Sequence, residues 1–63
     1  MKLKEQILDI RDSGLANMLD ANAVQAVAYE RGYYQLVLFI ENRRRDYQRF
    51  IMTKDESLLE RED

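Results

Sequence analysis

Apolar residues in the first part of the chain recur at helical spacing. Leu3, Ile7 and Ile10 lie four and three positions apart, with charged residues between them. This spacing places all three side chains on one face of a helix. Gly14 follows the pattern directly and is the residue type that most often terminates a helix. We therefore predict an amphipathic helix from about residue 3 to residue 13.

A second helix is predicted to begin after Asp20. An aspartate at this position can accept a hydrogen bond from a backbone N–H group of the first turn. Val24, Val27 and Ala28 then follow on one stripe of a helix. Gly32 lies at the end of the pattern and favours a turn, so the helix is expected to end just before it.

The longest apolar pattern predicts one continuous helix from Tyr33 to Met52. Its stripe is made of Tyr33, Leu36, Val37, Ile40, Tyr47, Phe50 and Ile51. Arg44 interrupts this stripe. The first part, residues 33–40, is apolar on nearly every side, which is typical of a helix covered all round. A buried β-strand over the same residues is the competing interpretation, because Tyr, Val, Phe and Ile favour sheets, but no partner strand is predicted elsewhere.

Together these patterns predict an all-α fold. We expect a small three-helix domain over residues 1–53, with a long C-terminal helix, followed by an acidic C-terminal tail over residues 54–63. A chain of 63 residues buries only about 60% of the surface that its unfolded form exposes. The sequence has no Cys or His, so neither a disulfide nor a typical zinc site can stabilise it.

Self-association is the remaining way to stabilise so small a core. We therefore expect a helical homodimer. The apolar surplus in the first part of the third helix suits a contact between subunits, because a side chain that finds no cover in one chain can find it in a second. The expected self-association residues are Tyr33, Tyr34, Leu36, Val37, Phe39 and Ile40.

Charge is distributed unevenly along the chain. The net charge is −2, yet residues 1–52 hold eight basic and seven acidic side chains, so the acidic excess lies in residues 53–63. After residue 30 the helical domain holds five arginines against two acidic residues, Glu41 and Asp46, so its C-terminal half is positive. Arginine side chains match the geometry of carboxylate and phosphate oxygens. The candidate partner-binding residues are Arg43, Arg44, Arg45 and Arg49.

The same arginines have potential partners on their own helix. Glu41 lies four residues before Arg45, and Asp46 lies three residues from both Arg43 and Arg49. Opposite charges at these separations pair along one face of a helix. The sequence therefore leaves two interpretations of the cluster open. It is either a solvated face whose charges pair with each other or a contact surface for an anionic partner.

Catalytic chemistry is poorly represented in the sequence. The chain has no His, no Cys and no Gly-rich phosphate loop, and its few hydroxyl side chains have no base nearby in sequence. Asp9 and Asp12 share a helix face, but basic neighbours favour ordinary surface charge over a metal site. We expect no enzyme activity, no cofactor and no metal site.

The expected compartment follows from the absence of targeting patterns. The N-terminal residues contain no apolar stretch of the kind found in secretory signals. The longest apolar stretch, residues 33–40, is about half as long as a membrane span. We therefore expect a cytoplasmic protein that does not bind a membrane.

A helix-turn-helix unit is the alternative that would bind DNA. Ala28 and Gly32 are four residues apart and are followed by Leu38, which matches the packing pattern of such a unit. The small Ala28 would let the helices cross, and Gly32 would permit the turn. Any helical hairpin makes the same demands, and residues 33–40 offer few polar side chains to base edges.

Several blocks of the sequence together resemble a known family. They are Ile10-Arg11-Asp12-Ser13-Gly14, Asn17-Met18, Val24-Gln25, Tyr33-Tyr34-Gln35-Leu36-Val37, Phe39-Ile40-Glu41 and Phe50-Ile51-Met52-Thr53. Over residues 2–53 the chain is similar to a small uncharacterised protein family carried by phages and mobile elements of Gram-positive gut bacteria. The resemblance implies an accessory or host-directed role and brings no activity with it. The extension from Lys54 to Asp63 departs from the family pattern.

Two functions follow from these observations. The first is a non-enzymatic accessory protein that binds a host or phage protein and modulates it, for example as an inhibitor of a bacterial defence system. The alternative is a small helix-turn-helix-like regulator that binds DNA as a dimer. The excess of apolar residues favours the first function, and the overall acidity of the chain counts against the second.

Overall fold

The computed structural model describes residues 2–59 and is all-helical over that range. It contains four α-helices and one short 3₁₀ helix. These are α1 (Leu3–Ser13), α2 (Ala21–Glu30), α3 (Tyr34–Asn42), α4 (Arg44–Thr53) and η1 (Glu56–Leu58). No strand occurs within residues 2–59, so the alternative of a buried strand at residues 33–40 is wrong.

The first helix confirms the sequence prediction at both ends. The backbone N–H of Lys2 donates to the Glu5 carboxylate over 2.8 Å, which stabilises the first turn. Gly14 follows the helix in the left-handed conformation, with φ 70°, and its N–H donates to the Arg11 carbonyl. Within the helix Leu3, Ile7 and Ile10 are buried, as their spacing predicts. The apolar stripe of α1 therefore faces the core along its whole length.

The second helix is also close to the prediction. The Asp20 carboxylate accepts the N–H of Ala23 over 3.2 Å and so caps the N-terminus. At the other end Gly32 has φ 78°, and the N–H of Tyr33 donates back to the Ala28 carbonyl over 2.8 Å. These contacts form the turn by which many helices end at a glycine. The helix stops at Glu30, one residue before the predicted end.

The prediction of one continuous helix from Tyr33 to Met52 is wrong. The chain leaves the helical conformation at Arg43, where φ is −136° and ψ is 49°, and two helices result. In a continuous helix Arg43 and Arg44 would lie on the apolar stripe between Ile40 and Tyr47, and burial of two guanidinium groups is costly. The break instead directs Tyr47 into the core and keeps both arginines at its edge.

The described part of the expected acidic tail, residues 54–59, folds back onto the body of the protein. Lys54 ends α4 in the left-handed conformation, with φ 62°, and reverses the chain. Asp55 then caps η1, because its carboxylate accepts the backbone N–H of Ser57 over 3.1 Å. The same carboxylate also accepts the Ser57 hydroxyl over 2.6 Å, and this hydrogen bond lowers the pKa of the carboxyl group. Leu58 is buried, and Leu59 packs against the core.

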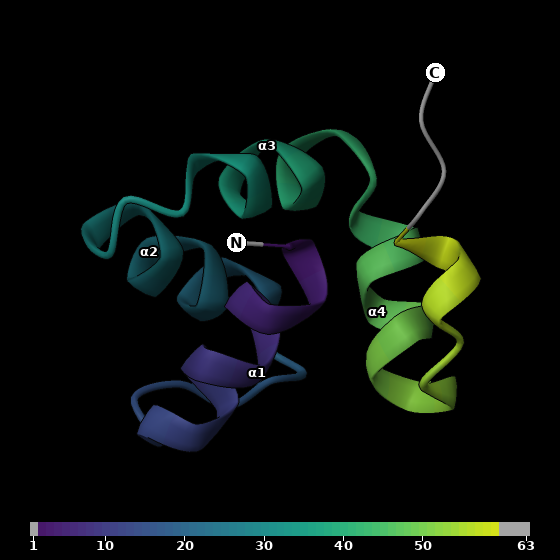
Figure 1. Cartoon of the computed structure of the whole chain (residues 1–63), viewed down its shortest axis with the longest axis horizontal. Coiled ribbons are helices and arrows are strands. Elements are labelled where there is room, and N and C mark those ends of the chain that lie inside the picture. The colour runs from purple at the N-terminus through teal and green to yellow at the C-terminus, as the bar shows by residue number, and fades with distance from the viewer. Residues whose placement is uncertain (1, 60–63) are drawn as a thin grey trace.

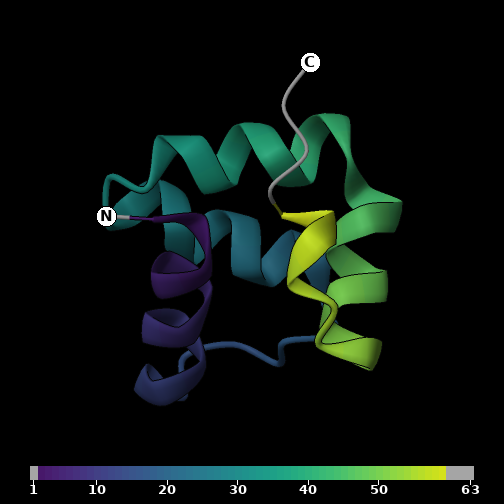
Figure 2. The same ribbon diagram turned by 45° about the vertical axis from the view of Figure 1, so that its right-hand side comes forward.

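The helices enclose a single core. In Figure 2, α3 runs across the top, α1 and α4 descend at the two sides, and α2 lies behind and between them. Figure 1 shows η1 lying beside α4 at the same side of the molecule. Nearly inaccessible side chains from every α-helix meet at the centre. The largest of them are Tyr47, Ile7, Ile10, Leu36, Ile40 and Val24. No helix within residues 2–59 has the length and apolar composition that a membrane span requires.

Candidate functional site

Half of the expected self-association residues lie inside the single chain. Leu36 and Ile40 are inaccessible to solvent, and Phe39 is buried beside them. They pack with the stripe of α1 and with Tyr47 of α4 in the same core cluster. The apolar excess of residues 33–40 is therefore covered mostly by α1, α2 and α4 of its own chain.

Tyr33 connects α1 to the turn between α2 and α3. Its hydroxyl donates to the Asp9 carboxylate over 2.6 Å, and the same carboxylate oxygen accepts the Arg31 guanidinium over 2.8 Å. The hydrogen bond to Asp9 raises the pKa of the Tyr33 phenol, because ionisation would remove its donor proton beside a negative charge. Val37, a further expected self-association residue, is half-buried against the core.

An apolar surface remains exposed on α2 and α3. Tyr34 is 58% exposed and Leu38 60% exposed, and they lie four residues apart on one face of α3. Tyr29 of α2, 64% exposed, meets the Tyr34 ring edge-on at a centroid distance of 5.7 Å. We call these three residues the apolar surface. Of these three residues, only Tyr34 is among the six expected self-association residues.

The Arg43 side chain stabilises the fold through several contacts. Its Nε donates to the Asp46 carboxylate over 3.0 Å, and its terminal nitrogen donates to the Leu58 carbonyl over 2.8 Å. The guanidinium carbon also lies 4.9 Å from the centre of the Phe39 ring. These contacts join α3, α4 and the segment after α4, so Arg43 serves the structure at the place where the predicted long helix breaks.

The other arginines present charge to solvent. Arg45 and Arg49 are exposed and lie on one face of α4 with Gln48 and Met52, at intervals of three and four residues. We call these four residues the arginine face; Arg44 is half-buried beside it. Sequence reasoning missed Gln48 and Met52, although the same helical spacing that groups the arginines includes both of them.

The expected pairing along this helix occurs only once within residues 2–59. Arg43 pairs with Asp46, but Arg45 and Arg49 make no ion pair with any described residue. The Glu41 carboxylate accepts instead from the Gln25 side chain of α2 over 3.1 Å. The break at Arg43 explains this, because Glu41 and Arg45 are in register only if one helix contains both.

The arginines also stand at the unfavourable end of their helix. Arg44 and Arg45 are the first two residues of α4, where the backbone N–H groups carry partial positive charge. Cations there oppose the helix dipole and are disfavoured by about 0.3 to 1 kcal/mol each. The stability of α4 therefore does not explain why arginines occupy these two positions.

The α2–α3 pair has the turn of a helix-turn-helix unit but a different packing. Ala28 is inaccessible to solvent and Gly32 adopts positive φ, as the pattern requires. Leu38, however, is 60% exposed, whereas the pattern has it packed between the helices. The exposed side chains of α3 include Glu41 and no Lys or Arg. This helix thus lacks the cations that contact DNA phosphates.

No metal-binding geometry occurs among residues 2–59. Within that range no three Asp or Glu side chains come together in a group able to hold an ion. Acidic residues are instead used for caps and ion pairs: Asp20 and Asp55 cap helices, and Asp9 and Asp46 hold arginines.

Comparisons with known proteins give the family without a function. Neither the search of curated proteins nor the search of solved structures found a match to this chain. One family model, described as a domain of unknown function and designated DUF5049, matches residues 1–55. The match includes all four α-helices and ends just before η1. Because it covers most of the 63-residue sequence, the chain belongs to the DUF5049 family.

Proposed function

We propose that this protein is a non-enzymatic module that binds another protein through the arginine face of α4. One observation carries the proposal. Arg45 and Arg49 are exposed, their guanidinium groups have no partner within residues 2–59, and Arg45 lies where the helix dipole disfavours a cation. A charge that does not stabilise its own chain is available to a partner. Carboxylates on that partner would accept the guanidinium N–H groups in pairs.

The composition of the arginine face favours a protein partner over nucleic acid. Met52 is 77% exposed, the largest exposed fraction among the exposed large hydrophobic side chains of the described part of the chain. Arg and Met are enriched at the centres of protein interfaces, whereas Lys, Asp and Glu are depleted there. None of those three depleted residue types belongs to the arginine face. A phosphate backbone would gain little from an exposed methionine.

The resemblance of the sequence to a family carried by phages and mobile elements suggests where the partner comes from. The partner is then a host or phage protein whose activity changes when this small chain docks on it, as an inhibitor of a defence system would act. We also propose that two copies associate through the apolar surface of Tyr29, Tyr34 and Leu38. The observation that supports association is the exposure of three adjacent large apolar side chains.

Site-specific photocrosslinking in cells that carry the gene tests the proposed function. A photoreactive residue at Gln48, in the middle of the arginine face, is expected to form one adduct of defined mass with a protein. The same residue at Asn22, exposed on α2, serves as the control and should not form that adduct. Combining the Gln48 probe with Arg45→Glu and Arg49→Glu should abolish the adduct while the circular dichroism spectrum keeps its helical form.

Two results would contradict the proposed function. An adduct at Gln48 that disappears on nuclease treatment would identify the arginine face as a nucleic-acid surface and favour the DNA-binding alternative. An adduct that persists in the charge-reversed protein would show that the arginines do not select the partner. A steep loss of binding with added salt would likewise favour nucleic acid, because contacts to phosphates release counterions.

A further inference from the structure

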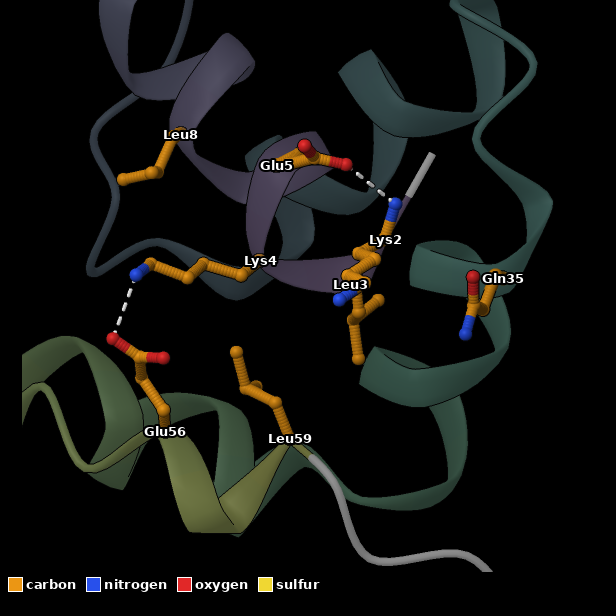
Figure 3. A pocket seen from close by; sticks show the side chains of 8 residues that line it. All are labelled: Lys2, Leu3, Lys4, Glu5, Leu8, Gln35, Glu56 and Leu59. Carbon is orange, nitrogen blue, oxygen red and sulfur yellow. Dashed lines mark hydrogen bonds and ion pairs between the residues drawn. The ribbon is translucent and has the colours of Figure 1, made fainter.

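A groove lies between α1 on one side and α4 with η1 on the other. It consists of two adjoining cavities, with volumes of about 660 and 300 Å³, which share Lys4, Leu8 and Glu56 in their walls. Figure 3 shows the larger cavity, with α1 above and η1 below it. The groove is distinct from the arginine face, none of whose residues lines it.

The floor of the groove is apolar and only partly covered. In the smaller cavity it is formed by Leu8 of α1, Met18 of the connection before α2 and Ile51 of α4, all of which are half-buried. In the larger cavity Leu59 extends from the end of η1 towards α1 (Figure 3). These half-buried apolar side chains remain partly in contact with water in both cavities, and covering them would be favourable.

The rim of the groove carries more positive than negative charge. The four cations among the lining residues are Lys2, Lys4, Arg11 and Lys54, and the two acids are Glu5 and Glu56. The Arg11 guanidinium is already paired with the neighbouring Asp12 carboxylate over 3.3 Å. The Glu5 carboxylate already accepts the backbone N–H of Lys2. The ammonium groups of Lys2 and Lys54 make no ion pair within residues 2–59. A molecule of net charge −2 therefore presents a positive rim around an apolar floor.

One ion pair crosses the groove where the two cavities adjoin. The Lys4 ammonium group lies 2.6 Å from the Glu56 carboxylate, and both side chains are about half exposed (Figure 3). An exposed pair of this kind contributes little to stability. A carboxylate from another molecule can therefore replace Glu56 at Lys4 with little loss, which would join the two cavities into one channel.

We propose that this groove binds an acidic amphipathic helix of a protein partner. The lining residues run from Lys2, the N-cap of α1, to Arg11, a length of about 14 Å, which matches about ten residues of a second helix. Apolar side chains of the bound helix contact Leu8, Met18 and Ile51, and its flanking carboxylates meet the cationic rim. The excess of rim cations over acids selects an acidic helix over a basic one.

A titration with designed peptides tests the proposal on the full chain. The probe is a blocked peptide of about 12 residues with leucines spaced three and four apart and glutamates on the remaining face. Its matched control has lysine at every glutamate position. In methyl NMR spectra we expect saturable shifts at Leu8, Met18 and Ile51 with the acidic peptide, and binding at least about tenfold weaker with the lysine peptide.

Variants separate the groove from the arginine face. Lys54→Glu, at an exposed rim position, should weaken the acidic peptide roughly threefold to fivefold while leaving the fold intact. Arg45→Glu with Arg49→Glu should leave this affinity unchanged, so the groove can fail or succeed independently of the proposed function. The proposal is overturned if neither peptide binds at about 1 mM, if both bind equally, or if the shifts appear outside the groove.

Discussion

At the scale of single residues, Tyr47 shows how one polar group is accommodated in a small core. Its side chain is inaccessible, and its hydroxyl donates to the Met18 carbonyl over 2.8 Å. Tyr47→Phe keeps the ring but removes the donor. We expect a loss of about 1 kcal/mol in the free energy of unfolding. The midpoint of thermal unfolding should therefore be about 4 to 8 °C lower. An unchanged midpoint would contradict the importance of this hydrogen bond.

Because Tyr47 is buried, we also expect the free energy of unfolding to fall at alkaline pH. Burial raises the pKa of Tyr47 to about 12 in the folded protein, against about 10 in the unfolded chain. The contribution to stability is complete below pH 10 and is lost as the pH rises from 10 towards 12, because the unfolded chain then releases its proton more readily.

Urea unfolding at several pH values measures this effect. The free energy of unfolding of the natural sequence should fall between pH 10 and 12, and that of Tyr47→Phe should fall less. Tyr33, whose pKa the hydrogen bond to Asp9 also raises, contributes to the decline in both proteins. The difference between the two curves therefore isolates Tyr47, and parallel curves would argue against its buried state.

At the scale of elements, Arg43 controls the segment that follows α4. Its guanidinium is bonded to the Leu58 carbonyl, so Arg43→Ala should release residues 54–59 from the body. We expect the amide hydrogens of Leu58 and Leu59 to exchange roughly tenfold faster, as the loss of a charge-assisted hydrogen bond implies. Arg44→Ala is the control, because Arg44 makes no such bond. Equal effects of the two substitutions would count against the assignment.

The first turn of α4 should become more stable when Arg45, a residue of the proposed binding surface, is replaced by an acid. Arg45→Glu replaces a cation that opposes the helix dipole with an anion that favours it, and the new carboxylate lies four residues before Arg49. We expect a gain of about 0.5 to 1 kcal/mol in unfolding experiments, together with loss of the Gln48 crosslink. Arg45→Gln should give an intermediate gain. A destabilised Arg45→Glu protein would mean that the arginine serves the fold after all.

The elements differ in how far the sequence reveals them. Helices α1 and α2 have local signals at their ends, Asp20 and two glycines, and both were predicted to within one or two residues. The boundary between α3 and α4 has no Gly or Pro. At this boundary the Arg43 guanidinium donates to the Leu58 carbonyl, 15 residues further along the chain, and no local pattern contains that contact.

The candidate surface was predictable to the same limited extent. The arginines were identified from composition, and helical spacing alone could have added Gln48 and Met52. Arg45 loses Glu41 as a partner because of the break at Arg43, which the sequence does not reveal. Leu38 faces solvent because of the way α3 packs, which is also a property of the tertiary fold. The groove combines side chains of α1, α4 and η1, whose proximity is a property of the tertiary fold.

At the scale of the whole molecule, the chain forms a complete core by itself. The radius of gyration is 10.3 Å, close to the value of about 11 Å expected for an independent domain of this length. A second subunit is therefore not required to cover Leu36, Phe39 or Ile40. The surfaces left for contact include the apolar surface on α2 and α3, the arginine face of α4 and the groove along α1.

Light scattering over a dilution series decides how the apolar surface is used. If two copies associate there, the measured mass at high concentration exceeds the chain mass of 7.6 kDa, and Leu38→Glu returns it to that value. Apolar contacts should make the association insensitive to salt. Met52→Glu, on the arginine face, is the matched control and should leave the mass unchanged. A mass of 7.6 kDa at every concentration would reject self-association, and Tyr29, Tyr34 and Leu38 would then be the exposed apolar residues most suited to contact a foreign protein.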